Sequence, residues 1–131
     1  MNDVLLQVEN LTVSYCTETH PLQATKAVTL DLHEGEVLGI VGASGSGKSS
    51  LLQAMLRTLP APGFIESGTV RLRGQDLTAL GDEDLRQIRW VDLSLVMQNA
   101  QSALNPLLRV EAHFEDTLAA HNANPPHTQL Q

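Results

Sequence analysis

Apolar and polar residues alternate along the first third of the chain in the manner of half-exposed strands. Residues 4–15, VLLQVENLTVSY, are rich in β-branched and apolar side chains and alternate in part, which predicts one or two strands. The segment 28–32 alternates more strictly and predicts an antiparallel strand, followed by a turn over 33–35. The run 37–41, VLGIV, has no polar side chain and is typical of a strand that is covered on both faces in a parallel sheet.

Helical spacing begins after this run. Residues 48–59, KSSLLQAMLRTL, place their apolar side chains on one stripe of a helix, and the PAPG segment at 60–63 ends it. The other expected elements are a hairpin strand over 69–73, a short helix over 81–90, an apolar strand over 92–98 and a helix over 110–121.

Composition narrows the class of protein. A chain of 131 residues with 42% hydrophobic residues predicts one globular domain, expected over 1–122, and a polar tail over 123–131 that should be disordered. The formal charge of −7 makes nucleic acid a poor partner, because phosphate contacts dominate that affinity. Cys16 is the only cysteine, so no intrachain disulfide is possible, and neither a secretory signal nor a membrane span is expected.

The chemistry lies in the segment GASGSGKSS between the apolar run and the helix. It matches the pattern G-x-x-x-x-G-K-[ST], in which glycines let the backbone approach a ligand and successive N–H groups surround phosphate oxygens. A lysine adds a full charge to the outer phosphates, and the next hydroxyl is a ligand for Mg²⁺. A plain glycine-rich turn is the competing interpretation. The candidate nucleotide-binding residues are Gly42, Ala43, Ser44, Gly45, Ser46, Gly47, Lys48, Ser49 and Ser50, with Ser49 also a metal ligand.

Four segments resemble the N-terminal half of the ATP-binding subunit of ABC transporters. The last of them is most similar to the subfamily that imports dipeptides, oligopeptides and nickel. The absence of an Asn-Lys-x-Asp motif separates the chain from GTPases, and the strands that precede the loop separate it from many kinases. The segments are LQVENLTVSY, KAVTLDLHEGEVLGIVGASGSGKSS, IESGTVRLRGQDL and VMQNAQSALNPLLRV.

The resemblance implies roles for two further residues. Tyr15 stands where this family places an aromatic ring that stacks on adenine, although a tyrosine packed against the sheet is the alternative. Gln98 matches a glutamine that reaches Mg²⁺ or the attacking water, in a loop that faces the membrane subunit. The chain departs from the family at Asn99 and Ala100, where an acidic residue and a proline are usual, and at Ala43, where this subfamily usually has glutamate.

The resemblance also implies a fold, partners and a location. The fold is an α/β P-loop NTPase of the ABC ATPase type with an N-terminal antiparallel β subdomain. The expected ligands are ATP and Mg²⁺. The expected partners are permease subunits and a second ATP-binding subunit in a head-to-tail dimer, at the cytoplasmic face of the membrane.

The family's signature motif, its Asp-Glu strand end and its switch histidine have no counterpart in these residues. Two hypotheses follow: a truncated ATP-binding subunit of a solute importer, for peptides or nickel, or a non-catalytic nucleotide-binding fragment. No catalytic residue is assigned. If the chain is truncated, strands that normally flank 37–41 are missing, which predicts an exposed apolar edge and low solubility or oligomers.

Overall fold

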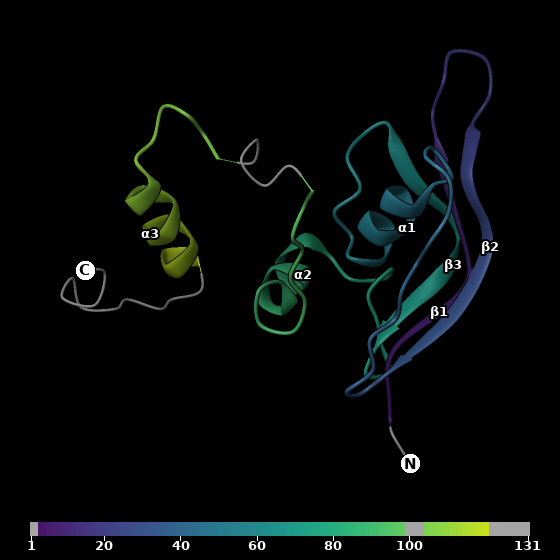
Figure 1. Cartoon of the computed structure of the whole chain (residues 1–131), viewed down its shortest axis with the longest axis horizontal. Helices are drawn as coiled ribbons and strands as arrows, with labels where there is room; N and C mark the ends of the chain where they lie inside the picture. The colour runs from purple at the N-terminus through teal and green to yellow at the C-terminus, as the bar shows by residue number, and fades with distance from the viewer. Residues whose placement is uncertain (1–2, 99–103, 121–131) are drawn as a thin grey trace. The chain divides into compact units, whose positions relative to one another are not determined.

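The computed structural model describes residues 3–98 and 104–120 and divides the chain into two compact units, Met1–Leu93 and Ser94–Gln131. The first unit is built on one antiparallel sheet with the strand order β2-β1-β3-β4 (Figure 1). Its strands are β1 (Val4–Tyr15), β2 (Leu22–His33), β3 (Gly63–Leu72) and β4 (Gln75–Asp76). The expected N-terminal antiparallel subdomain is therefore present, and β1 is a single strand.

A bulge explains why β1 alternates only in part. Leu6 and Val8 are buried in its first half, whereas Leu11 and Val13 are buried in its second half. The register shifts between these halves, where Asn10 has a φ of 50°. One extra residue moves the following side chains to the other face, so the buried apolar positions change from even to odd numbers. Thr12 and Ser14, which alternate with them in the second half, are buried as well.

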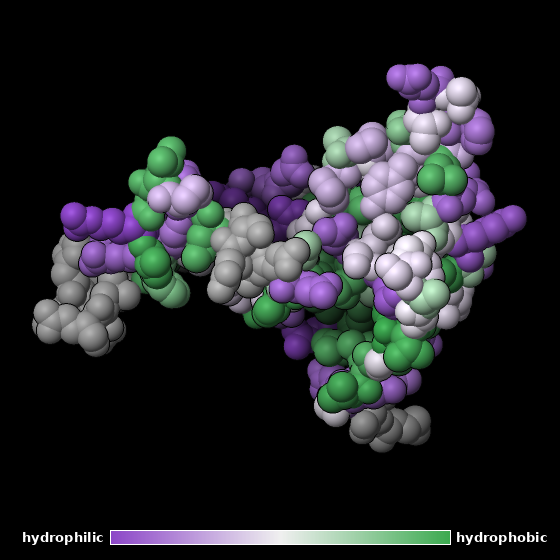
Figure 2. Space-filling view, turned by 45° about the horizontal axis from the view of Figure 1, so that its top comes forward, coloured by the Kyte–Doolittle hydropathy of each residue, from purple (hydrophilic) through white to green (hydrophobic). Residues whose placement is uncertain are grey.

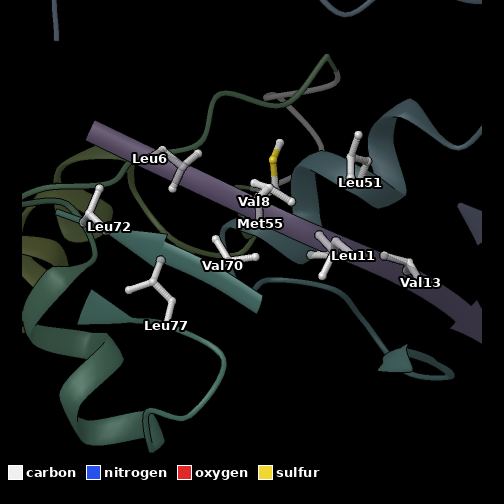
Figure 3. Close-up of a cluster of buried hydrophobic side chains, with 10 residues drawn as sticks. Leu6, Val8, Leu11, Val13, Leu51, Met55, Val70, Leu72 and Leu77 are labelled. Atoms are coloured by element: carbon white, nitrogen blue, oxygen red, sulfur yellow. The ribbon is translucent and has the colours of Figure 1, made fainter. Parts of the chain in front are cut away.

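The core lies between the sheet and helix α1 (Lys48–Met55). The helix contacts β1, β2 and β3 and buries Leu51, Ala54 and Met55 against them. Figure 3 shows Leu51 and Met55 beside the apolar side chains of β1, with β3 and Leu77 completing the cluster. The helical stripe predicted from residue 48 is thus the face that packs on the sheet, although the helix ends at Met55 rather than at 59.

The strand predicted over 37–41 is wrong. These residues form no ladder with any described strand, and Val37 and Val41 are 95% and 93% exposed. A strand is stabilised when its backbone N–H and C=O groups form hydrogen bonds with a neighbouring strand. An apolar run that has no such neighbour does not form a strand. The exposure of this apolar segment agrees with expectation. On the face drawn in Figure 2, green apolar residues reach the surface among purple polar ones.

The strand predicted over 92–98 is also wrong, because only Leu93 pairs, in an isolated bridge with Arg89. Before it lies the expected short helix, α2 (Asp82–Ile88), whose first turn carries three acidic residues that suit the helix dipole.

In the second unit, α3 (Val110–Ala120) confirms the predicted helix and has no buried residue. Within the described ranges, no helix has the length and hydropathy needed to cross a bilayer. The predicted tail over 123–131 lies outside the described residues.

Candidate functional site

The glycine-rich loop leads directly into α1 and leaves the start of that helix uncapped. Gly45 and Gly47 have φ values of 77° and 90°, a region that side chains with a Cβ rarely adopt. No side chain caps the helix, and within residues 3–98 no backbone acceptor meets the N–H groups of Lys48 and Ser49. These donors and the positive end of the helix dipole form a site that suits an anion.

Contact with β2 fixes the end of the loop. A Cβ built on Gly47 would lie 2.3 Å from the carbonyl oxygen of Ala24 and 2.9 Å from Cγ2 of Thr25. Only glycine allows the loop to approach the strand this closely. The second glycine of the motif therefore serves packing as well as backbone conformation, and it joins the loop to the sheet.

The Lys48 ammonium group lies inside the loop. Its Nζ donates to the carbonyl oxygens of Gly42 and Ala43 at 2.9 and 2.7 Å, and to Oγ of Ser46 at 3.3 Å. Carbonyl and hydroxyl oxygens are weaker acceptors for a cation than phosphate oxygens are. The Lys48 ammonium therefore donates only to neutral acceptors in the loop, and the oxygens of a bound anion can replace them.

A hollow of about 520 Å³ opens beside the loop. Its walls come from the loop and α1 on one side and from the end of β1 and the start of β2 on the other. The volume is in the range of small-molecule sites. The lining residues are Tyr15, Leu22, Gln23, Ala24, Gly45, Ser46, Gly47, Lys48, Ser49 and Ser50.

Tyr15 belongs to the sheet and also lines the hollow, and its stacking on adenine stays a prediction. It pairs with Gly63 of β3 and Leu22 of β2, so it belongs to the sheet, and its side chain is partly buried. It also lines the hollow together with Lys48. Packing on the sheet and facing the site are therefore compatible for this ring.

A hydrogen-bonded group extends this wall across three strands. The buried Ser14 hydroxyl on β1 donates to the Glu66 carboxylate on β3, and Gln23 Nε2 on β2 donates to the same carboxylate at 3.3 Å. The Ser14 hydrogen bond is the largest cause that holds the pKa of Glu66 below its ordinary value, and the Gln23 bond adds to it. Glu66 therefore stays ionised to a lower pH than an ordinary glutamate, and its carboxylate accepts the hydrogen bond from Gln23 at the hollow.

Of the two predicted metal ligands, Ser49 lines the hollow beside Lys48 and presents a hydroxyl oxygen, a ligand type that Mg²⁺ accepts. Gln98 is exposed, lies in a turn of the second unit and remains a prediction. Asn99 and Ala100, the two departures from the family, lie outside the described residues. Among described residues, no three His, Cys, Asp or Glu side chains gather into a metal-binding group.

Sequence reasoning missed the contribution of β2. Leu22, Gln23 and Ala24 line the hollow, yet nothing in the sequence indicated that they would lie there. No motif marks them, because their place at the site comes from the pairing of β2 with β1 and from the approach of Gly47. The only local signal was the glycine pattern, because a residue without a Cβ lets another segment of backbone approach the loop closely.

Comparison with known proteins agrees with this geometry. The family model described as ABC transporter matches residues 25–129, a range that includes the loop and Gln98 but not Tyr15. The chain is 42% identical over 127 residues to the dipeptide transport ATP-binding protein DppD of Caldanaerobacter subterraneus, covering 97% of this chain and 39% of that protein. It is 34% identical to the oligopeptide transport ATP-binding protein OppD of Bacillus subtilis, covering 89% of this chain and 33% of that protein.

Among solved structures, the chain resembles the dimeric structure of MJ0796, a bacterial ABC transporter cassette. The TM-score is 0.73 at 26% identity, over 95% of this chain and 51% of that one. The same values hold for that cassette in a post-hydrolysis state bound to ADP and Pi. The expected fold type is confirmed, and the chain spans about two fifths or less of the length of the two transport proteins it matches.

Proposed function

Because this chain belongs to the ABC transporter family, we propose that its glycine-rich loop binds the phosphates of ATP with Mg²⁺. The observation that carries the proposal is the position of the Lys48 ammonium, which lies within the loop and at the wall of the hollow. The free N–H groups at the start of α1 and the Ser49 hydroxyl supply the remaining groups that a magnesium triphosphate needs.

In the proposed complex the triphosphate lies along residues 42–50, and Lys48 exchanges its carbonyl partners for phosphate oxygens. The Ser49 hydroxyl would be a ligand of the Mg²⁺, which would offset the negative charge of the phosphates. The adenine lies against the Tyr15 ring at the other end of the hollow, where stacking tolerates any base. The post-hydrolysis cassette bound to ADP and Pi, whose fold this chain shares, supports a nucleotide as the ligand.

For the protein as a whole, we propose an ATP-binding subunit that energises the import of peptides. The support is the names of the relatives, which are dipeptide and oligopeptide transport ATP-binding proteins. Permease subunits, a second ATP-binding subunit and a place at the cytoplasmic face of the membrane belong to the same proposal, and the dimeric cassette supports the second subunit.

Uptake of a labelled dipeptide by cells with and without the gene tests the proposed peptide import. Nickel, which the sequence left open as the imported solute, is the second solute to measure in that assay.

The binding step is tested by titrating the chain with ATP and Mg²⁺. Lys48→Ala should weaken ATP binding by at least about tenfold, since a hydrogen bond to a charged group contributes roughly 1.5–3 kcal/mol. Lys26→Ala is the matched control, because it removes the same charge from β2 at an exposed position that does not line the hollow. Equal ATP affinity in all three proteins would contradict the proposal.

A phosphate-release assay on the same samples tests whether the chain turns over the ATP that it binds. Release that depends on Lys48 would show that these 131 residues hydrolyse ATP. Binding without release agrees with both a truncated subunit and a non-catalytic fragment.

A further inference from the structure

A hydrogen bond joins two of the residues that line the hollow. The phenol oxygen of Tyr15 and Oγ of Ser50 are 2.8 Å apart and partly buried. Tyr15 is the last residue of β1, whereas Ser50 lies in the first turn of α1, two residues after Lys48. Both side chains line the same hollow. The bond therefore connects the sheet wall of the site to the helix that carries the phosphate-binding groups.

The same ring is held from a second direction. A Cβ built on Gly63 would lie 2.9 Å from Cε1 of Tyr15 and 2.8 Å from Cγ of Leu59. The ring thus packs across Gly63, its cross-strand partner, with Leu59 next to it. Contact with Gly63 limits the ring on that side, and the bond to Ser50 fixes its hydroxyl end.

We propose that Ser50 is a positioning residue, which holds the Tyr15 ring at a fixed place relative to Lys48 and so couples the base end of the site to the phosphate end. This inference rests on the proposed nucleotide function. A ring that is already held loses little side-chain entropy when a base stacks on it. A serine hydroxyl can accept from the phenol and still donate to an anion, so the bond is compatible with a bound phosphate.

The first test needs no ligand. Tyr15 is the only tyrosine in the chain, so 3-fluorotyrosine labelling reports on this ring alone in ¹⁹F NMR. Ser50→Ala should shift and broaden its signal, because the hydroxyl loses its partner and the ring gains freedom. Ser50→Thr, which keeps a hydroxyl, should restore the signal. An identical spectrum for Ser50→Ala would overturn the proposal.

The second test compares ATP with inorganic tripolyphosphate, which has no base. Ser50→Ala and Tyr15→Phe should each weaken ATP binding by about twofold to tenfold, the usual range for one hydrogen bond, and should weaken tripolyphosphate binding less. The double variant should bind ATP as each single variant does, because both remove the same bond. Ser50→Thr should recover most of the affinity, and urea unfolding confirms that each variant is folded.

Two results would overturn this coupling. Equal losses for ATP and tripolyphosphate in Ser50→Ala would show that the hydroxyl acts on phosphate alone. Additive losses in the double variant would show that the two side chains act independently. Failure of the proposed function differs from both, since the unaltered chain would then bind neither ligand or would bind both without Lys48.

Discussion

Gly47 occupies a position that a residue with a Cβ would fill only with strain. It combines a φ of 90° with a close approach to the Ala24 carbonyl oxygen. Gly47→Ala should lower the free energy of unfolding by about 2 kcal/mol or more, because a left-handed conformation costs about 1–2 kcal/mol before the clash is counted. Urea unfolding followed by circular dichroism measures this change.

Gly45→Ala is the control for that prediction. Gly45 has a φ of 77°, but a Cβ placed there would meet nothing within 4 Å. It should therefore show the backbone cost alone and remain more stable than Gly47→Ala. Equal losses at the two positions would mean that the contact with Ala24 adds nothing.

The loop residues could be predicted from sequence because the pattern G-x-x-x-x-G-K-[ST] states local requirements of backbone and charge. The partners of those residues could not be predicted. The carbonyl that lies against Gly47 and the hydroxyl that meets Tyr15 come from residues 23 and 35 positions away in sequence. Such contacts follow from tertiary packing, which no local pattern encodes.

At the scale of elements, the apolar segment 37–41 lies at the surface without a strand partner. Val37→Thr with Val41→Thr should leave the free energy of unfolding within about 0.5 kcal/mol, since exposed side chains away from special features contribute little. The double variant should also associate less, because it removes exposed apolar surface. Urea unfolding and sedimentation velocity measure the two effects.

Val8→Thr makes the same substitution at a fully buried position of β1. It should cost about 1–3 kcal/mol, the usual price of burying an unpaired hydroxyl. A monomeric unaltered chain would contradict the predicted association. A double variant as unstable as Val8→Thr would contradict the assignment of 37–41 as exposed surface.

Elements were predicted well where their pattern and their partners lie in the same part of the chain. β1 pairs with both β2 and β3, and α1 packs on all three, so the alternating and helical patterns identified these elements. The strands predicted over 28–32 and 69–73 cover only part of β2 and of β3. The segments 37–41 and 92–98 were predicted as strands on apolar character alone. Apolar character favours burial, but a strand also requires a neighbouring backbone, and neither segment has a ladder among the described residues.

At the scale of the whole molecule, the first unit holds the core and the candidate site together. A chain that ends at Leu93 should keep the unfolding free energy of the sheet and the Lys48-dependent binding of tripolyphosphate. Among the residues that the structure describes, the core and the lining of the hollow lie at or before that position. Chemical unfolding and calorimetric titration of both lengths test this. Loss of the cooperative transition in the shorter chain would show that residues after 93 support the first unit.

The order of strands has a consequence for biosynthesis. β1 is made first but lies in the middle of the sheet, with β2 on one side and β3 on the other. As the polypeptide leaves the ribosome, β1 and β2 can pair early as a hairpin. The backbone groups on the other edge of β1 stay unpaired until residues 63–72 have been made. At a translation rate of about 5–20 residues per second, that edge stays open for seconds, during which the nascent chain is most in need of chaperone protection.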